Sequence, residues 1–103
     1  MNDQNFQNQQ PPKQIQIKAQ DADLKGIFAN AMQITHTREE FVLDFLNIFP
    51  PQGTLNARII TTPGHLKRIV LALQDNLKKY ENTFGEIEIA DMPKNEVGFG
   101  ERA

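Results

Sequence analysis

Residues 61–85 read TTPGHLKRIVLALQDNLKKYENTFG, and this stretch decides the fold of the 103-residue chain. Its apolar side chains recur at steps of three and four residues, which places them in one stripe about 100° wide on a helix. The stripe consists of Leu66, Ile69, Val70, Leu73, Leu77, Tyr80 and Phe84. The pattern predicts a long amphipathic helix that lies on a core, with Leu73 fully buried at the centre of the contact.

Both ends of this predicted helix carry their own signals. Thr62 is a good N-cap, and Pro63 suits the first helical position because its missing N–H has no partner there. Gly85 can adopt the left-handed conformation that ends many helices. Lys78 and Lys79 lie toward the C-terminal end, where the helix dipole favours cations.

Composition bounds the rest of the chain. The chain has 103 residues and a hydrophobic content of 39%, which fit one small domain. Its net charge is −2, whereas a general polyanion binder usually carries an excess of basic residues. The chain has no cysteine, which excludes disulfides, thiolate metal sites and thiol chemistry. No apolar run is long enough to span a bilayer and the first residues lack a signal-peptide pattern, so we expect a cytoplasmic protein with no membrane segment.

Upstream of the helix, apolar and polar residues alternate as in β-strands. The predicted strands are residues 13–19, residues 27–35, a run beginning at Phe41, and residues 55–61. The turn between the last two is set by Pro50, Pro51 and Gly53. We predict an α+β fold, with a four-stranded antiparallel meander followed by one long amphipathic helix packed on one sheet face. Residues 86–90 alternate again and could add a short fifth strand.

The predicted domain covers residues 13–90. Residues 1–12 are rich in Asn and Gln and end in two prolines, and residues 91–103 contain Pro93, Gly98 and Gly100. Neither segment has enough apolar side chains to offset the entropy of ordering it. We therefore expect a disordered N-terminal tail and a flexible C-terminal tail.

The run from Phe41 to Leu46 is apolar on both sides of the strand, and one helix can cover only one sheet face. The second face would expose Val42, Leu46 and Ile60, which predicts a homodimer that buries these three residues. The alternative is that the fifth strand or a tail covers this face. Asp44 shares it, and we expect Arg58 on the neighbouring strand to pair with that carboxylate.

Several blocks together resemble a small prokaryotic family of proteins of unknown function, DUF3467. The blocks are residues 40–45 (EFVLDF), 51–53 (PQG), 58–68 (RIITTPGHLKR), 80–81 (YE) and 84–85 (FG). The resemblance covers about residues 15–89 and implies a compact single-domain protein, but it carries no established activity or catalytic residue. The order of four strands and a helix is also similar to the plan of Whirly and PUR-type repeats, which pair and bind single-stranded nucleic acid; this is a likeness of fold alone.

No motif of enzyme chemistry is present. His36 with Glu39 and Glu40 is the nearest approach to a metal-ligand pattern, but no second ligand cluster accompanies it. Phosphate loops, nucleophile elbows and dinucleotide-binding glycine patterns are missing as well. We therefore predict no catalytic residues, no metal and no cofactor.

Two binding functions remain open. The first is a small oligomeric module that recruits another protein, in keeping with Leu71 on the polar side of the helix. The second is binding of single-stranded nucleic acid, which the acidic pI and the scarcity of spare aromatic residues oppose. We favour the first.

The start of the helix breaks a local rule, because cations stand where the helix dipole favours anions. The residues that could hold an anion or an acidic partner there are Arg58, Gly64, His65, Lys67 and Arg68. The alternative is that Lys67 and Arg68 point to water or pair with Asp44 or Glu40.

Overall fold

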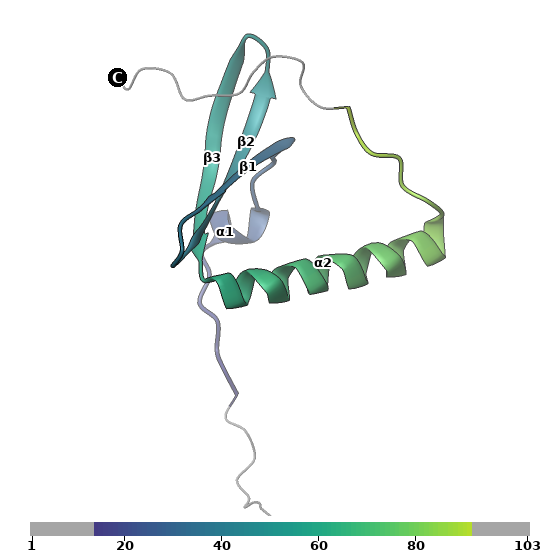
Figure 1. The fold of residues 1–103 in the computed structure, drawn as a ribbon, viewed down its shortest axis with the longest axis horizontal. Helices are drawn as coiled ribbons and strands as arrows, with labels where there is room; N and C mark the ends of the chain where they lie inside the picture. The colour runs from purple at the N-terminus through teal and green to yellow at the C-terminus, as the bar shows by residue number, and fades with distance from the viewer. Residues whose placement is uncertain (1–13, 92–103) are drawn as a thin grey trace, which may run out of the picture.

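The computed structural model of the chain describes residues 14–91. These residues form a three-stranded antiparallel sheet and two helices (Figure 1). The strands are β1 (Ala31–His36), β2 (Phe41–Phe49) and β3 (Gln52–Thr61), in the order β1-β2-β3. The α+β class, the antiparallel meander and the long C-terminal helix are confirmed. The predicted tails, residues 1–12 and most of 91–103, lie outside the described residues.

The predicted first and fifth strands do not form in the described part of the chain. Residues 14–20 and 85–91 have no regular secondary structure, and Ile15, Ile17 and Ile89 are 84%, 88% and 94% exposed. An alternating pattern shows only that a segment suits a strand, whereas a strand also needs a neighbour to bond with. Neither segment has one here.

Tight turns join the three strands. At the β1–β2 turn, the Thr37 hydroxyl accepts hydrogen bonds from the backbone N–H groups of Glu39 and Glu40, both at 3.3 Å. Pro50 and Pro51, joined by a cis peptide bond, form the β2–β3 turn that the sequence predicted. Residues 37–40 thus form the hairpin turn between β1 and β2.

β1 begins later than predicted because an asparagine side chain takes over the pairing. Asn30 accepts a hydrogen bond from the Ile48 N–H at 2.8 Å and donates one to the Ile48 carbonyl at 3.0 Å. Together with the backbone bond from the Asn30 N–H to the Leu46 carbonyl at 2.9 Å, these bonds continue the contact between the two strands beyond Ala31. Asn30 therefore has the partner that a polar residue on this strand requires.

A short helix, α1 (Asp21–Lys25), occupies the segment that the sequence marked as a break between strands. It has a capping box in which the Gln20 N–H donates to the Asp23 carboxylate at 3.0 Å. The residues after it run to the sheet, where the Asn56 side chain donates to the Phe28 carbonyl at 2.6 Å. Asn56 is free to do so because the register shifts between Phe45 and Leu46 and leaves it without a strand partner.

The long helix α2 (Pro63–Phe84) has the predicted bounds. The Thr62 hydroxyl caps it by accepting from the His65 N–H at 3.2 Å, and Gly85 follows it with a φ of 97°. This φ is one that side chains with a Cβ rarely adopt, which explains glycine at this position.

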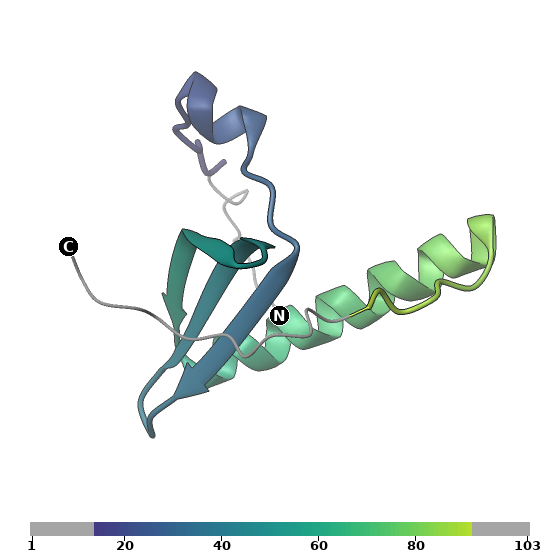
Figure 2. The same ribbon diagram turned by 90° about the horizontal axis from the view of Figure 1, so that it is seen from above.

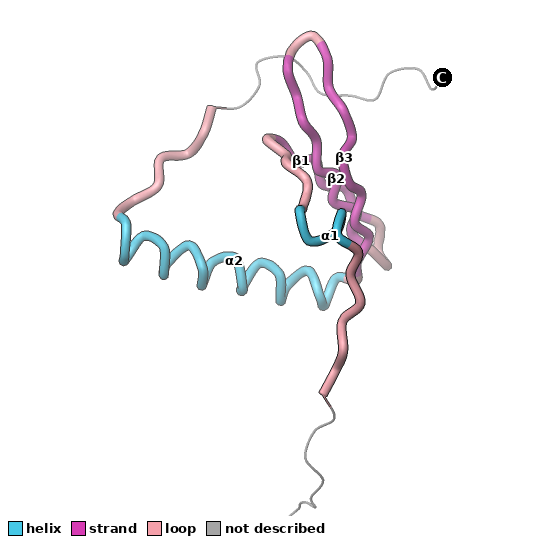
Figure 3. The backbone as a smooth tube through the Cα atoms, turned by 180° about the vertical axis from the view of Figure 1, so that it is seen from behind, coloured by secondary structure: helices cyan, strands magenta, loops and turns pink. Residues whose placement is uncertain are grey.

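The predicted packing of α2 on the sheet is wrong. α2 leaves the end of β3 and extends away from the sheet, as Figures 1 and 2 show from two directions and Figure 3 from behind. Leu73, expected to be fully buried, is 59% exposed. The physical reason lies at the junction, because Thr62 alone separates β3 from α2 and the chain has no loop with which to reverse direction.

Burial within the described residues is confined to the central strand. Leu43, Asp44 and Leu46 of β2 are 8%, 5% and 5% exposed, and no residue of either helix is buried. Small domains normally bury one contiguous apolar core. The apolar side chains of α2 therefore have no cover within this arrangement.

Candidate functional site

The predicted anion site divides into two parts in the structure. Gly64, His65, Lys67 and Arg68 lie on the first two turns of α2, whereas Arg58 lies on β3 and binds Asp44. The Arg68 guanidinium is 2.9 Å from Nδ1 of His65. A Cβ placed on Gly64 would meet nothing within 4 Å, so the backbone there is open to approach. The helix start thus joins His65 to Arg68 and carries Lys67 on the same two turns, whereas Arg58 lies apart on β3.

Arg58 is held by the expected carboxylate. Its Nε and one terminal nitrogen donate to the two oxygens of Asp44 at 2.7 and 2.9 Å, a bidentate pair across β2 and β3. The hydrogen bond from Arg58, aided by its charge, holds the pKa of Asp44 below its usual value, and Asp44 in turn raises the pKa of Arg58. The predicted Asp44–Arg58 pairing is confirmed. Lys67 and Arg68 do not take Asp44 as their partner.

The predicted dimer interface shares a face with this ion pair. Val42 lies directly opposite Ile60, and Val42 is half-buried while Ile60 is 56% exposed. Leu46 is already covered within the chain. A second copy placed on this face would meet Ile60 together with the half-exposed Arg58 side chain.

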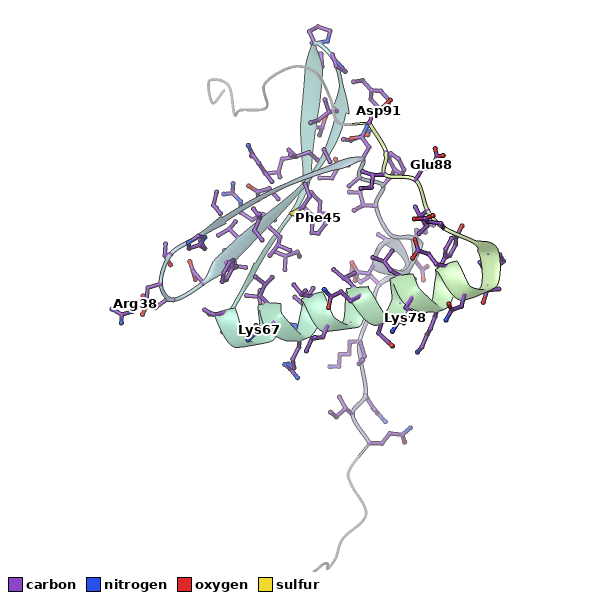
Figure 4. All side chains as sticks on the ribbon, turned by 45° about the vertical axis from the view of Figure 1, so that its right-hand side comes forward. Arg38, Phe45, Lys67, Lys78, Glu88 and Asp91 are labelled. Atoms are coloured by element: carbon purple, nitrogen blue, oxygen red, sulfur yellow. The ribbon has the colours of Figure 1, made fainter. Side chains whose placement is uncertain are left out.

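The opposite side of the sheet is more apolar. We call it the apolar sheet face, and Phe45 marks it in Figure 4. Met32, Ile34 and Ile59 on this face are 47%, 45% and 48% exposed, and they surround the buried Leu43. By the strand register and the alternation of side chains, the face consists of Met32, Ile34, His36, Phe41, Leu43, Phe45, Ala57, Ile59 and Thr61.

The apolar stripe of α2 is the larger exposed surface. Leu66 and Ile69, near the junction with β3, are half-buried, but farther along the helix Val70 is 43%, Leu77 51% and Phe84 73% exposed. The Tyr80 and Phe84 rings lie against each other with centroids 4.9 Å apart. Figure 4 shows side chains standing around the whole circumference of α2, with Lys67 near the junction and Lys78 farther along.

Sequence reasoning found the stripe but not its exposure. The missed signal is the junction between β3 and α2. The strand ends at Thr61 and the helix begins at Pro63, so only Thr62 is available for a turn between them. Asn30, which orders the start of the sheet through its bonds to Ile48, has no local sequence signal that would identify this partner.

The structure offers little for metal chemistry in residues 14–91. No group of three His, Cys, Asp or Glu side chains comes together there as metal ligands would. His36, the candidate nearest to a ligand pattern, lies with its ring centroid 5.2 Å from that of Phe41. Within the same residues, no helix has the length and hydropathy needed to cross a bilayer.

Comparison with known proteins gives one match. The family model described as "Protein of unknown function (DUF3467)" matches residues 1–89, which include the sheet and the whole of α2. No curated protein and no solved structure matches the chain significantly. The chain belongs to the DUF3467 family.

Proposed function

We propose that this DUF3467 family member is a non-enzymatic, cytoplasmic, homodimeric module that recruits another macromolecule. One observation carries the proposal, namely the amount of apolar surface that a single chain leaves exposed on α2 and on the apolar sheet face. Large exposed apolar patches mark sites of protein association. Two such surfaces on one small protein leave room for both a second copy and a different partner.

The charged start of α2 is the part of the surface suited to an acidic partner. His65 and Arg68 are joined at 2.9 Å, and the side chain of Lys67 makes no hydrogen bond or ion pair within the described residues. A carboxylate-bearing segment of another protein would find cations and exposed backbone at Gly64 together in one place.

Nucleic acid is the less favoured partner. The likeness to Whirly and PUR-type repeats depended on four strands before the helix, and the described residues form three. The net charge of −2 also gives no long-range attraction for phosphate backbones.

A capture experiment with matched variants tests recruitment. The tagged protein, Arg68→Glu and the control Lys78→Glu are each used to capture partners from native lysate, with and without nuclease. We expect the parent and Lys78→Glu to retain the same protein in near-stoichiometric amount after nuclease treatment, and Arg68→Glu to lose it. Retention that disappears with nuclease would favour nucleic-acid binding. No retention above an unrelated bait would contradict the recruiting role.

A further inference from the structure

α2 is a long helix without a packing partner. It has 22 residues, none of which is buried, and its packing against the sheet is limited to the first two turns. In proteins, most of the stability of a helix comes from the packing of its amphipathic face rather than from intrinsic propensity. Its sequence does not compensate, because it includes Gly64, Asn76, Asn82 and Thr83, which have weak helix propensity. Some further contact must therefore stabilise it.

The spacing of the stripe indicates what kind of contact this is. Six of its side chains follow one another at steps of four, three, four, three and four residues, which is the a/d repeat of a coiled coil. We call these six the α2 seam: Leu66, Leu73 and Tyr80 at d, and Val70, Leu77 and Phe84 at a. Every a and d position from 66 to 84 is apolar. A repeat of 3.5 residues keeps such a seam aligned with another helix along its whole length.

We propose that α2 pairs with α2 of a second copy as an antiparallel two-stranded coiled coil. The inference rests on the homodimer of the proposed function and specifies how it forms. In the register that uses all six seam residues, Leu66 packs against the partner's Phe84. Val70 then meets the partner's Tyr80, and Leu73 meets the partner's Leu77. The aliphatic side chains at the N-terminal end of each α2 thus face the larger aromatic side chains at the C-terminal end of the partner's α2.

The charges beside the α2 seam select the antiparallel orientation. In that register Lys67 and Glu81, both at e positions, approach each other across the interface twice, once on each side of the two-fold axis. Lys67 has no partner in the described part of its own chain, and only one oxygen of Glu81 is occupied, by the Ile87 N–H at 3.0 Å. A parallel pair would instead place Ile69 beside the partner's Gln74, and Asn76 beside the partner's Glu81, with no opposite charges.

The remaining surface of α2 is suited to water. Lys79 and Asp75 form an ion pair at 3.1 Å on the side away from the α2 seam, where both side chains are largely exposed. Arg68, Lys78 and Leu71 also lie outside the seam by their heptad positions. Leu71, 63% exposed, therefore provides a control residue on the same helix with the same side chain as Leu77.

The first test is the effect of a charge in the α2 seam. Leu77 is 51% exposed in the single chain and lies beyond the first two turns of α2, where the half-buried residues are, so Leu77→Asp should leave the fold of the protomer intact. Light scattering coupled to size exclusion should report a dimer for the parent and for Leu71→Asp. For Leu77→Asp we expect a monomer, with a dissociation constant raised at least 100-fold.

The outcomes separate this inference from the proposed function. If both variants stay dimeric, pairing through α2 is wrong while the homodimer stands, and the apolar sheet face becomes the interface. If the parent itself is monomeric at tens of micromolar, both the pairing and the homodimer are wrong.

Orientation is tested by exchanging the two charges. Lys67→Glu and Glu81→Lys should each weaken the dimer about tenfold, since in either variant two weakly attractive contacts between exposed charges become repulsive. The double variant Lys67→Glu/Glu81→Lys should return to within about threefold of the parent. If the double variant weakens the dimer by as much as the two single changes added together, the antiparallel register is wrong.

A distance measurement checks orientation independently. The chain has no cysteine, so a single cysteine at Asp75 or at Asn82 can carry one spin label per copy. Both positions lie on the outer side of the proposed pair, and residue 75 is level with the two-fold axis along the length of the helices. In the antiparallel pair, labels at 82 are separated by about 20 Å more along the axis than labels at 75. Equal distances for the two positions would show a parallel pair and contradict the inference.

Discussion

Truncation of Leu43 measures how much of the stability of the sheet depends on its few buried side chains. Leu43 is 8% exposed and lies on the central strand between Ile34 of β1 and Ile59 of β3. Leu→Ala changes at buried sites cost about 2–5 kcal/mol, of which part comes from the cavity left behind. Because Ile34 and Ile59 are themselves 45% and 48% exposed, they can close over the gap. We therefore expect Leu43→Ala to lower the free energy of unfolding by about 2–3 kcal/mol.

Urea denaturation followed by circular dichroism is the assay, at one fixed protein concentration because the stability of the proposed dimer would depend on that concentration. With a slope of about 1–3 kcal/mol per molar urea, the midpoint should fall by about 1 M or more. Leu71→Ala is the matched control, since Leu71 is 63% exposed and its truncation should change stability by less than about 0.5 kcal/mol. Equal midpoint shifts for the two variants would refute the assignment of Leu43 to the core.

Three further predictions address local features. Asn30→Ala removes two hydrogen bonds to Ile48 and should cost about 1–2 kcal/mol, with faster amide exchange at Ile48 as the direct readout; unchanged exchange would contradict the ladder role. Thr62→Ala removes the cap of α2 and should cost about 1 kcal/mol together with some helicity, whereas Thr83→Ala, at the other end, should leave the N-terminal turn unaffected. Because Arg58 lowers the pKa of Asp44 in the folded state, the ionised form stabilises the fold above the ordinary value of 3.8 and that contribution is lost as the pH falls below it. The stability difference between the parent and Asp44→Asn should therefore be constant near neutral pH and shrink in acid; a difference that grows in acid would show the opposite sign.

The parts of the fold that could be predicted are those fixed by neighbours in the sequence. Thr62, Pro63 and Gly85 define the ends of α2 through the backbone groups they cap or the φ they allow, and these signals act within a few residues. The Asp44–Arg58 pair was predicted from opposite charges on adjacent strands, but its register was not, because the pairing of Phe49 with Gln52 at the turn would place Ala57 opposite Asp44 and only the shift between Phe45 and Leu46 brings Arg58 there.

The parts that could not be predicted depend on partners distant in the sequence. Residues 13–19 and 86–90 alternate like strands, yet alternation does not say which edge, if any, would accept them. The start of β1 depends on the side chain of Asn30 bonding to Ile48, eighteen residues away. Within the predicted anion site, His65 and Arg68 on α2 lie in contact because they are close in the sequence. Arg58 is not part of this group because it binds Asp44 on the neighbouring strand.

The α2 stripe illustrates the same division between local and distant information. An apolar face on a helix predicts burial, but it is equally compatible with the chain's own sheet and with a second helix. Two features of this chain separate the alternatives. The single residue between β3 and α2 directs the helix away from its own sheet, and the alternation of four- and three-residue steps from Leu66 to Phe84 matches the seam of a helix pair. A stripe that packed on a sheet would have no need to keep Lys67 and Glu81 beside its two ends. Their equivalent heptad positions, fourteen residues and two heptads apart, let them meet across an antiparallel pair of identical helices, and this supports the proposal that a second copy of this chain covers the exposed face.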